Sequence, residues 1–179
     1  MVLEKIIQIP PFTITGKMNK QFLIMGVTGS GKTTIARHLA RKLKVLFIEG
    51  DDYHSIESKK KMMLGIGINN IERSEWIRKI CDLVYHLDKN NYDFVLACSA
   101  LKEIHRSMLL SSAPNLKICW LELDTDDLNI RLKKRKHHFA SRELLASQLV
   151  SLESPNDDVK FTNTGSIDSV IEQITEKYL

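Results

Sequence analysis

Residues 26–33 read Gly-Val-Thr-Gly-Ser-Gly-Lys-Thr, and this stretch decides which fold the rest of the chain can adopt. The apolar run at 22–25 precedes it and is typical of a buried parallel strand. Residues 32–43 follow it with apolar side chains at helical spacing. A glycine-rich turn between a strand and a helix lets successive backbone N–H groups point at an anion. The stretch therefore predicts a phosphate-binding loop.

The spacing of this loop matches the pattern GxxxxGK[ST], in which each residue type has a task. The backbone would hold the phosphates of a nucleotide, Lys32 would reach the β- and γ-phosphates, and the Thr33 hydroxyl would ligate Mg²⁺. The sequence thus predicts ATP and Mg²⁺ as cofactors, and a glycine-rich turn without a ligand is the weaker alternative. We expect the nucleotide to contact the following residues: Gly26, Thr28, Gly29, Ser30, Gly31, Lys32, Thr33 and Thr34.

Predicted strands and helices alternate along the chain from residue 21 onward. Strands are expected at 22–25, 45–48, 94–98, 118–123 and 159–162, and helices at 32–43, 56–64, 72–87, 102–110, 125–136, 141–152 and 166–178. This alternation is typical of a parallel sheet with helices on both faces. We therefore expect an α/β protein with the three-layer P-loop NTPase fold, in which helices flank a five-stranded parallel sheet. A mobile helical lid is expected at about 131–145.

The composition limits the class of protein. The 179 residues are 43% apolar and 27% charged, and the formal net charge of +4 suits an anionic small molecule without demanding a nucleic acid. The chain contains no apolar stretch near the roughly 20 residues of a membrane span, and Glu4 and Lys5 interrupt the N-terminal segment. We expect a cytoplasmic protein that binds neither membranes nor nucleic acid, with its three cysteines buried as small apolar groups.

Three carboxylates and a histidine follow the second predicted strand, where residues 49–54 read Glu-Gly-Asp-Asp-Tyr-His. Ligands of open parallel sheets bind at the carboxyl ends of the strands, which gathers 49–54, 26–33, 99–102 and 122–124 around one cleft. Alone, these carboxylates could be a solvated turn. Facing a γ-phosphate, one of them could hold the metal through water, and another could orient or deprotonate an attacking hydroxyl.

Residues 26–33 and 47–54 together resemble the gluconokinase family of small P-loop sugar-acid kinases. Further blocks extend the resemblance over about residues 21–179: Lys61-Met62, Arg73-Ser74-Glu75-Trp76, residues 97–102 with Arg106, Arg131-Leu132 with Arg135, His138-Phe139, Ser147-Gln148 and residues 152–155. The resemblance implies ATP-dependent phosphorylation of D-gluconate to 6-phospho-D-gluconate. It also implies an N-terminal extension at 1–20, a P-loop kinase domain at 21–179, and the fold of shikimate and nucleoside monophosphate kinases. A homodimer is a further expectation from this resemblance.

The resemblance also implies roles on the acceptor side. Asp51 would contact the accepting hydroxyl as a catalytic residue, and Glu49 would support Mg²⁺ together with Thr33. The sugar acid is expected to meet the following residues: Asp51, His54, Arg73, Lys102, Arg106 and His138. An anionic substrate gives the cationic members of this set a physical purpose.

Two arginines stand four residues apart on the predicted lid helix, Arg131 and Arg135. We expect both to bind the nucleotide, and Arg131 to act in catalysis with Lys32 by neutralising charge on the transferred phosphoryl group. Residues 131–138, which read Arg-Leu-Lys-Lys-Arg-Lys-His-His, could instead be a solvated basic helix face. They are too short and too poor in aromatic residues for a typical nucleic acid patch.

Two further alternatives stay open. The stretch 67–72 departs from the usual family pattern, as does His105, which stands where tyrosine is usual. The acceptor could therefore be another small sugar acid or shikimate. A nucleotide-binding regulator or ATPase is an alternative from a different class, but it would leave Asp51, Arg73 and Lys102 without a task.

Overall fold

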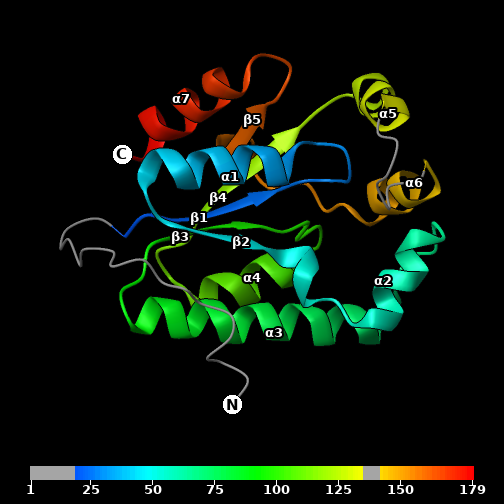
Figure 1. Cartoon of the computed structure of the whole chain (residues 1–179), viewed down its shortest axis with the longest axis horizontal. Helices are drawn as coiled ribbons and strands as arrows, with labels where there is room; N and C mark the ends of the chain where they lie inside the picture. The colour runs from blue at the N-terminus through cyan, green and yellow to red at the C-terminus, as the bar shows by residue number, and fades with distance from the viewer. Residues whose placement is uncertain (1–18, 135–141) are drawn as a thin grey trace.

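The computed structural model describes residues 19–134 and 142–179, which form one parallel sheet surrounded by helices (Figure 1). The strands are β1 (Gln21–Met25), β2 (Leu46–Glu49), β3 (Phe94–Ala97), β4 (Lys117–Glu122) and β5 (Lys160–Thr162). The helices are α1 (Lys32–Leu43), α2 (Ile56–Met63), α3 (Asn70–Lys89), α4 (Glu103–Ser112), α5 (Thr125–Lys134), α6 (Arg142–Ser151) and α7 (Ile167–Tyr178). Two 3-10 turns, η1 (Gly50–Tyr53) and η2 (Asp157–Val159), complete the described elements. The strand order is β2-β3-β1-β4-β5.

The sheet separates two apolar cores because successive side chains of a strand point to opposite faces. On β1, Phe22 and Ile24 pack with α1 and α7, whereas Leu23 and Met25 pack with α3 and α4. All four of these side chains are fully buried. Figure 1 shows the resulting layers, with α1 and α7 above the sheet and α3 and α4 below it. The predicted three-layer α/β fold with a five-stranded parallel sheet is confirmed.

The largest shift of a predicted helix start falls in the stretch that departs from the family pattern. Helix α3 begins at Asn70, two residues before the expected start, because Asn69 caps it. The Asn69 side chain accepts from Glu72 N at 2.9 Å, and the Glu72 carboxylate accepts from Asn69 N at 2.9 Å. Such a reciprocal capping box satisfies two N–H groups that the helix itself cannot pair. The altered residues are therefore a well-formed helix start beside the cavity described below.

The cysteines Cys81, Cys98 and Cys119 are buried and free, as expected. Burial raises the pKa of the Cys98 and Cys119 thiols above the ordinary range. Both thiols are therefore protonated at neutral pH and pack as small apolar groups.

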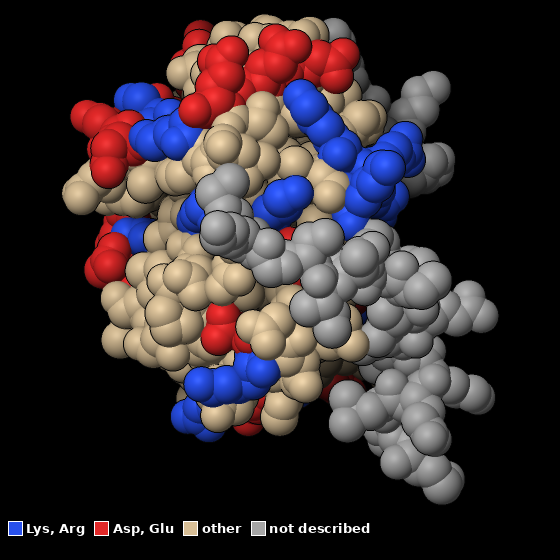
Figure 2. Space-filling model, turned by 90° about the vertical axis from the view of Figure 1, so that its left-hand side faces the viewer, with Lys and Arg blue, Asp and Glu red and all other residues tan. Residues whose placement is uncertain are grey.

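No helix among the described residues is both long enough and apolar enough to cross a membrane. Figure 2 shows the end of the molecule on the left of Figure 1, where Lys and Arg side chains form separate groups with acidic and uncharged side chains between them. The described side chains that are visible on this face form no continuous basic stripe of the kind that follows a nucleic acid backbone. Of the predicted N-terminal extension, only residues 19 and 20 lie within the described part of the chain.

Candidate active site

The phosphate loop connects the end of β1 to the first turn of α1, as expected. Gly26 has a φ of +145°, and a Cβ there would lie 2.7 Å from the Leu121 carbonyl of the neighbouring strand. Gly31 has a φ of +96°, and a Cβ there would lie 2.5 Å from Asn163 Nδ2. Residues with side chains rarely adopt such φ values and would also collide with these atoms. The glycine spacing of the sequence motif is therefore a steric requirement of this loop.

Contacts from three other segments hold the loop. Asn163, which follows β5, donates from Nδ2 to the Ser30 carbonyl at 2.7 Å, and its own carbonyl accepts from Arg131. A Cβ on Gly31 would lie 3.6 Å from Arg131 Nη1, so the α5 arginine lies directly beside the loop. The third contact comes from α6, where Gln148 Oε1 accepts from Thr28 N at 2.6 Å. Asn163 therefore links the backbone of the loop at Ser30 to the side chain of Arg131.

The metal side of the site consists of Thr33 and Glu49, which are hydrogen-bonded to each other. Burial raises the pKa of Glu49, the hydrogen bond from Thr33 lowers it, and the charge of Asp51 raises it. A hydroxyl and a carboxylate are the oxygen ligands that Mg²⁺ takes, usually one or two from the protein with water and phosphate oxygens for the rest. The described residues contain no group of three or more His, Cys, Asp or Glu that could hold a metal alone. The pair therefore fits Mg²⁺ held mainly by a nucleotide.

Asp51 and His54 lie at the end of β2 in opposite environments. The Asp51 side chain is 61% exposed, whereas that of His54 is 4% exposed, and Asp51 Oδ1 lies 3.8 Å from His54 Nε2. The His54 ring stacks on Trp76, with centroids 4.3 Å apart, and Trp76 Nε1 donates to the Gly50 carbonyl at 2.7 Å. Burial lowers the pKa of His54 to about 4 against the opposing charge of Asp51, so the ring is neutral at pH 7.

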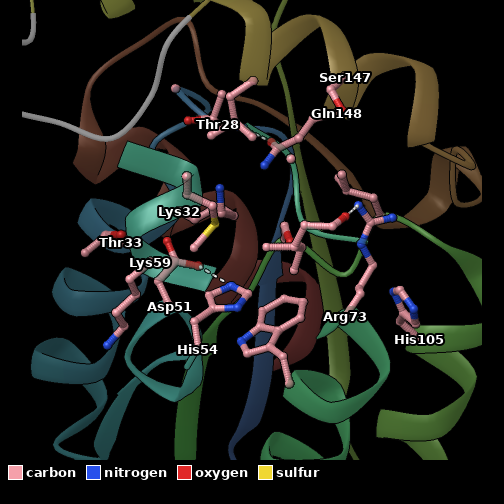
Figure 3. A pocket seen from close by; sticks show the side chains of 18 of the residues that line it. Thr28, Lys32, Thr33, Asp51, His54, Lys59, Arg73, His105, Ser147 and Gln148 are labelled. Atoms are coloured by element: carbon pink, nitrogen blue, oxygen red, sulfur yellow. Dashed lines mark hydrogen bonds and ion pairs between the residues drawn. The ribbon is translucent and has the colours of Figure 1, made fainter. Parts of the chain in front are cut away.

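A cavity of about 330 Å³ joins the phosphate loop to the acceptor-side residues (Figure 3). It brings together eight of the predicted site residues: Thr28, Gly29, Gly31, Lys32, Thr33, Asp51, His54 and Arg73. Figure 3 shows Arg73 beside His105 on the side away from Lys32. Burial lowers the pKa of both, and the charges of Arg73 and Lys102 lower that of His105 further. One end of the cavity therefore suits the phosphates of a nucleotide and the other a small anion.

Two predicted substrate-binding residues lie outside the lining of this cavity. Arg106 is only 2% exposed, and its guanidinium donates to the carbonyls of Ala100 and Leu101 at 3.2 and 2.9 Å. It also pairs with Glu103 at 2.5 Å, so its donors are directed at its own loop and helix. Lys102 is the N-cap residue of α4 and does not line the cavity.

Several other predicted site residues also lie outside the cavity lining. Ser30 and Gly26 are enclosed in the loop, Thr34 points its backbone carbonyl at His38, and Glu49 and Arg131 flank the loop. The predicted residues Arg135 and His138 lie outside the described part of the chain.

The cavity also includes residues to which the sequence analysis assigned no role, chiefly His105 and Gln148, although Ser147-Gln148 is one of the blocks that resemble the family. Gln148 stands three residues after Leu145, which is 3% exposed and packs in an apolar cluster around Val27 and Leu128. Residues three apart lie on the same side of a helix, so Gln148 is a polar residue on the side that Leu145 buries. A polar residue in that position is a signal that could have indicated Gln148. For His105 the only sequence signal was its departure from the family pattern.

The fold and this cavity define the class: the protein is a P-loop kinase that acts on a small molecule. The family model described as AAA domain matches residues 23–150. The chain is 35% identical over 158 residues to the thermosensitive gluconokinase of Escherichia coli (strain K12), covering 88% of this chain and 84% of that one. It is 38% identical over 154 residues to a probable gluconokinase of Xenopus tropicalis, covering 78% and 81%.

A solved structure agrees with these relatives. The crystal structure of a gluconokinase from Sinorhizobium meliloti 1021 superimposes with a TM-score of 0.80 at 29% sequence identity, covering 90% of this chain and 93% of that one. The chain belongs to the gluconokinase family.

Proposed function

We propose that the protein transfers the γ-phosphoryl group of MgATP to D-gluconate, giving 6-phospho-D-gluconate and ADP. The observation that supports this most is the single cavity that runs from Lys32 past Asp51 to Arg73. This order is what a transfer between a nucleotide and a carboxylate-bearing acceptor requires. The relatives' names as gluconokinases identify the acceptor.

On the donor side, the loop backbone and Lys32 would hold the phosphates of ATP. Lys32 Nζ already points across the loop, where it donates to the Val27 carbonyl at 3.0 Å. Thr33 and Glu49 would hold Mg²⁺, which would neutralise part of the phosphate charge when it is bound. Arg131 lies close enough to Gly31 to add a further positive charge beside the transferred group. Arg135 is proposed to act with it on the sequence pattern alone.

On the acceptor side, Asp51 is exposed at the cavity wall and is the carboxylate that we assign to the substrate hydroxyl. It would orient the hydroxyl and accept its proton while the oxygen–phosphorus bond forms and the bond to ADP breaks. Arg73 and His105 would meet the carboxylate of the sugar acid, and Arg73 is fixed by donating to the Ile68 carbonyl at 3.4 Å. His54 would line the cavity as a neutral ring. Lys102 and Arg106 would hold the loop at 98–102 in its conformation.

A different small sugar acid is the second candidate acceptor. It is favoured by one observation, which is that the altered residues Gly67 and Ile68 line the cavity. Any change of acceptor specificity would therefore act through this loop, while the donor side would remain the same.

The test is an acceptor panel with MgATP, in which release of ADP is followed for D-gluconate, other six-carbon sugar acids and shikimate. We expect turnover with gluconate at the highest kcat/KM. Faster turnover with another acid would contradict the gluconate assignment alone. No release of ADP above the background hydrolysis with any acceptor would contradict the proposed reaction.

A further inference from the structure

One peptide group of the phosphate loop is held on both of its sides. The Val27 carbonyl accepts from Lys32 Nζ at 3.0 Å, and the N–H of Thr28, in the same planar unit, donates to Gln148 Oε1 at 2.6 Å. Lys32 is the cation that reaches the β- and γ-phosphates in loops of this spacing. Its neighbouring peptide therefore lies at the γ end of the phosphate site. Gln148 contacts the loop at the point where ATP and ADP differ.

The helix that carries Gln148 is firmly placed. Leu145, one turn earlier, is buried with Val27 and Leu128, and beyond the helix Glu153 N donates to the Leu101 carbonyl at 3.0 Å. The Glu153 carboxylate accepts in turn from the N–H of Glu103 at 2.6 Å, at the start of α4. Helix α6 thus lies between the donor side and the acceptor side, and Figure 3 shows Gln148 reaching from it toward Thr28.

The chemistry of a carboxamide allows Gln148 to serve two states of the loop. A backbone N–H can only donate, so the contact to Thr28 uses the oxygen of Gln148 and leaves its NH₂ group for an acceptor. The oxygens of a γ-phosphoryl group only accept, and they would compete for the Thr28 N–H. The last torsion of a glutamine side chain is soft, so the group can turn its NH₂ toward those oxygens without moving the helix.

We propose that Gln148 distinguishes ATP from ADP at this site. Its oxygen satisfies the Thr28 N–H when the γ position is empty, and its NH₂ group donates to the γ-phosphoryl group when ATP is bound. ADP leaves the first arrangement undisturbed. The proposal rests on the proposed use of MgATP, but not on the identity of the acceptor.

The test measures equilibrium binding of ADP and of the β,γ-imido analogue of ATP, each with Mg²⁺ and without an acceptor. The decisive variant is Gln148→Glu, which keeps an oxygen for Thr28 but replaces the NH₂ donor with a negative charge. We expect the affinity for the analogue to fall about 10- to 100-fold, the range for one hydrogen bond to a charged group. The affinity for ADP should fall clearly less, because the new charge lies at the γ position and farther from the β-phosphate.

Two further variants keep the result interpretable. Gln148→Met removes the donor without adding charge, and we expect it to weaken the analogue about 10-fold while ADP binding stays near the wild-type value. Gln173→Glu makes the same chemical change on the exposed face of α7 and should alter neither affinity. Thermal unfolding of each apoprotein shows whether the variant is folded.

An equal loss of ADP and analogue affinity in folded Gln148→Glu would overturn the proposal, because a merely structural contact would weaken both ligands alike. Unchanged affinity for the analogue in both Gln148 variants would also overturn it. A wild-type protein that binds neither nucleotide would overturn the proposed function together with this inference.

Discussion

Asp51 and His54 are three residues apart in the sequence, yet they differ in burial and therefore in the role that each can play. The carboxylate of Asp51 is exposed and available to a substrate, whereas the buried imidazole is held neutral against Trp76. The sequence predicted that both would contact the sugar acid. It could not predict the stacking, because Trp76 joins His54 only when α3 packs under the end of β2.

At this scale, Asp51→Asn tests the assigned base. The amide keeps the size of the side chain but cannot accept the hydroxyl proton, so we expect kcat to fall about 10²- to 10⁴-fold while ADP affinity is unchanged. Steady-state kinetics and equilibrium ADP binding measure the two effects. Asp82→Asn, an exposed change on α3, is the matched control. Wild-type kcat in Asp51→Asn would show that the hydroxyl proton leaves by another route.

His54 should make stability depend on pH. The folded-state pKa of His54 is about 4 and the ordinary value is 6.5, so the unfolded chain binds more protons between these two pH values. The stabilisation is present above pH 6.5 and is lost as pH falls toward 4, with an upper limit of about 3 kcal/mol. Urea unfolding at pH 7 and pH 5 measures this loss.

The variant His54→Phe keeps a flat ring on Trp76 but cannot titrate. We expect it to lose less free energy of unfolding than the wild type between pH 7 and pH 5. His86→Phe, an exposed change on the same helix as Trp76, should retain the wild-type pH dependence. An identical pH dependence in His54→Phe and the wild type would contradict the burial argument.

At the scale of elements, Arg106 fixes the loop between β3 and α4. Ala100 in this loop has a φ of +41°, which is unfavourable for a residue with a side chain, and it is fully buried. The Arg106 guanidinium holds the carbonyls of Ala100 and Leu101, and Leu101 lines the cavity. Arg106 therefore shapes the acceptor side without facing it.

Arg106→Leu should leave these buried carbonyls unpaired and lower the free energy of unfolding by about 2–3 kcal/mol. We also expect the KM for the acceptor to rise more than the KM for ATP, each compared with the wild type, because the loop belongs to the acceptor side. Urea unfolding and steady-state kinetics check both effects, and Arg78→Leu on the exposed face of α3 is the control. If stability is unchanged and the acceptor KM rises, Arg106 contacts the substrate directly, as the sequence predicted.

Apolar periodicity predicted the order and type of the elements because it reflects burial, which decides the fold. Helix α1 has the predicted bounds, and its apolar face of Ile35 and Leu39 is buried as expected. The direction of polar side chains was less predictable. A cation near the start of a helix can point into a cleft, as Arg73 does, or beneath the preceding loop, as Arg106 does. Sequence spacing does not distinguish these two cases.

At the scale of the whole molecule, the sheet aligns the ends of β1, β2 and β3 along one edge of the cavity. The donor side is built on β1 and α1, and the acceptor side on the segments that follow β2 and β3. Helix α6 contacts the donor side through Gln148, and the segment that follows it contacts the acceptor side through Glu153. Phosphoryl transfer is therefore a property of the assembled cavity, whereas the loop at 26–33 alone accounts only for binding a nucleotide.

The most direct test of this account is phosphorus NMR of the protein mixed with MgATP and D-gluconate. We expect the γ-phosphate signal of ATP to be replaced by one phosphomonoester signal of the sugar acid, in an amount equal to the ADP formed. Lys32→Ala, which removes the cation at the phosphates, should form neither product. Release of inorganic phosphate without a phosphomonoester, or no consumption of ATP, would contradict the account.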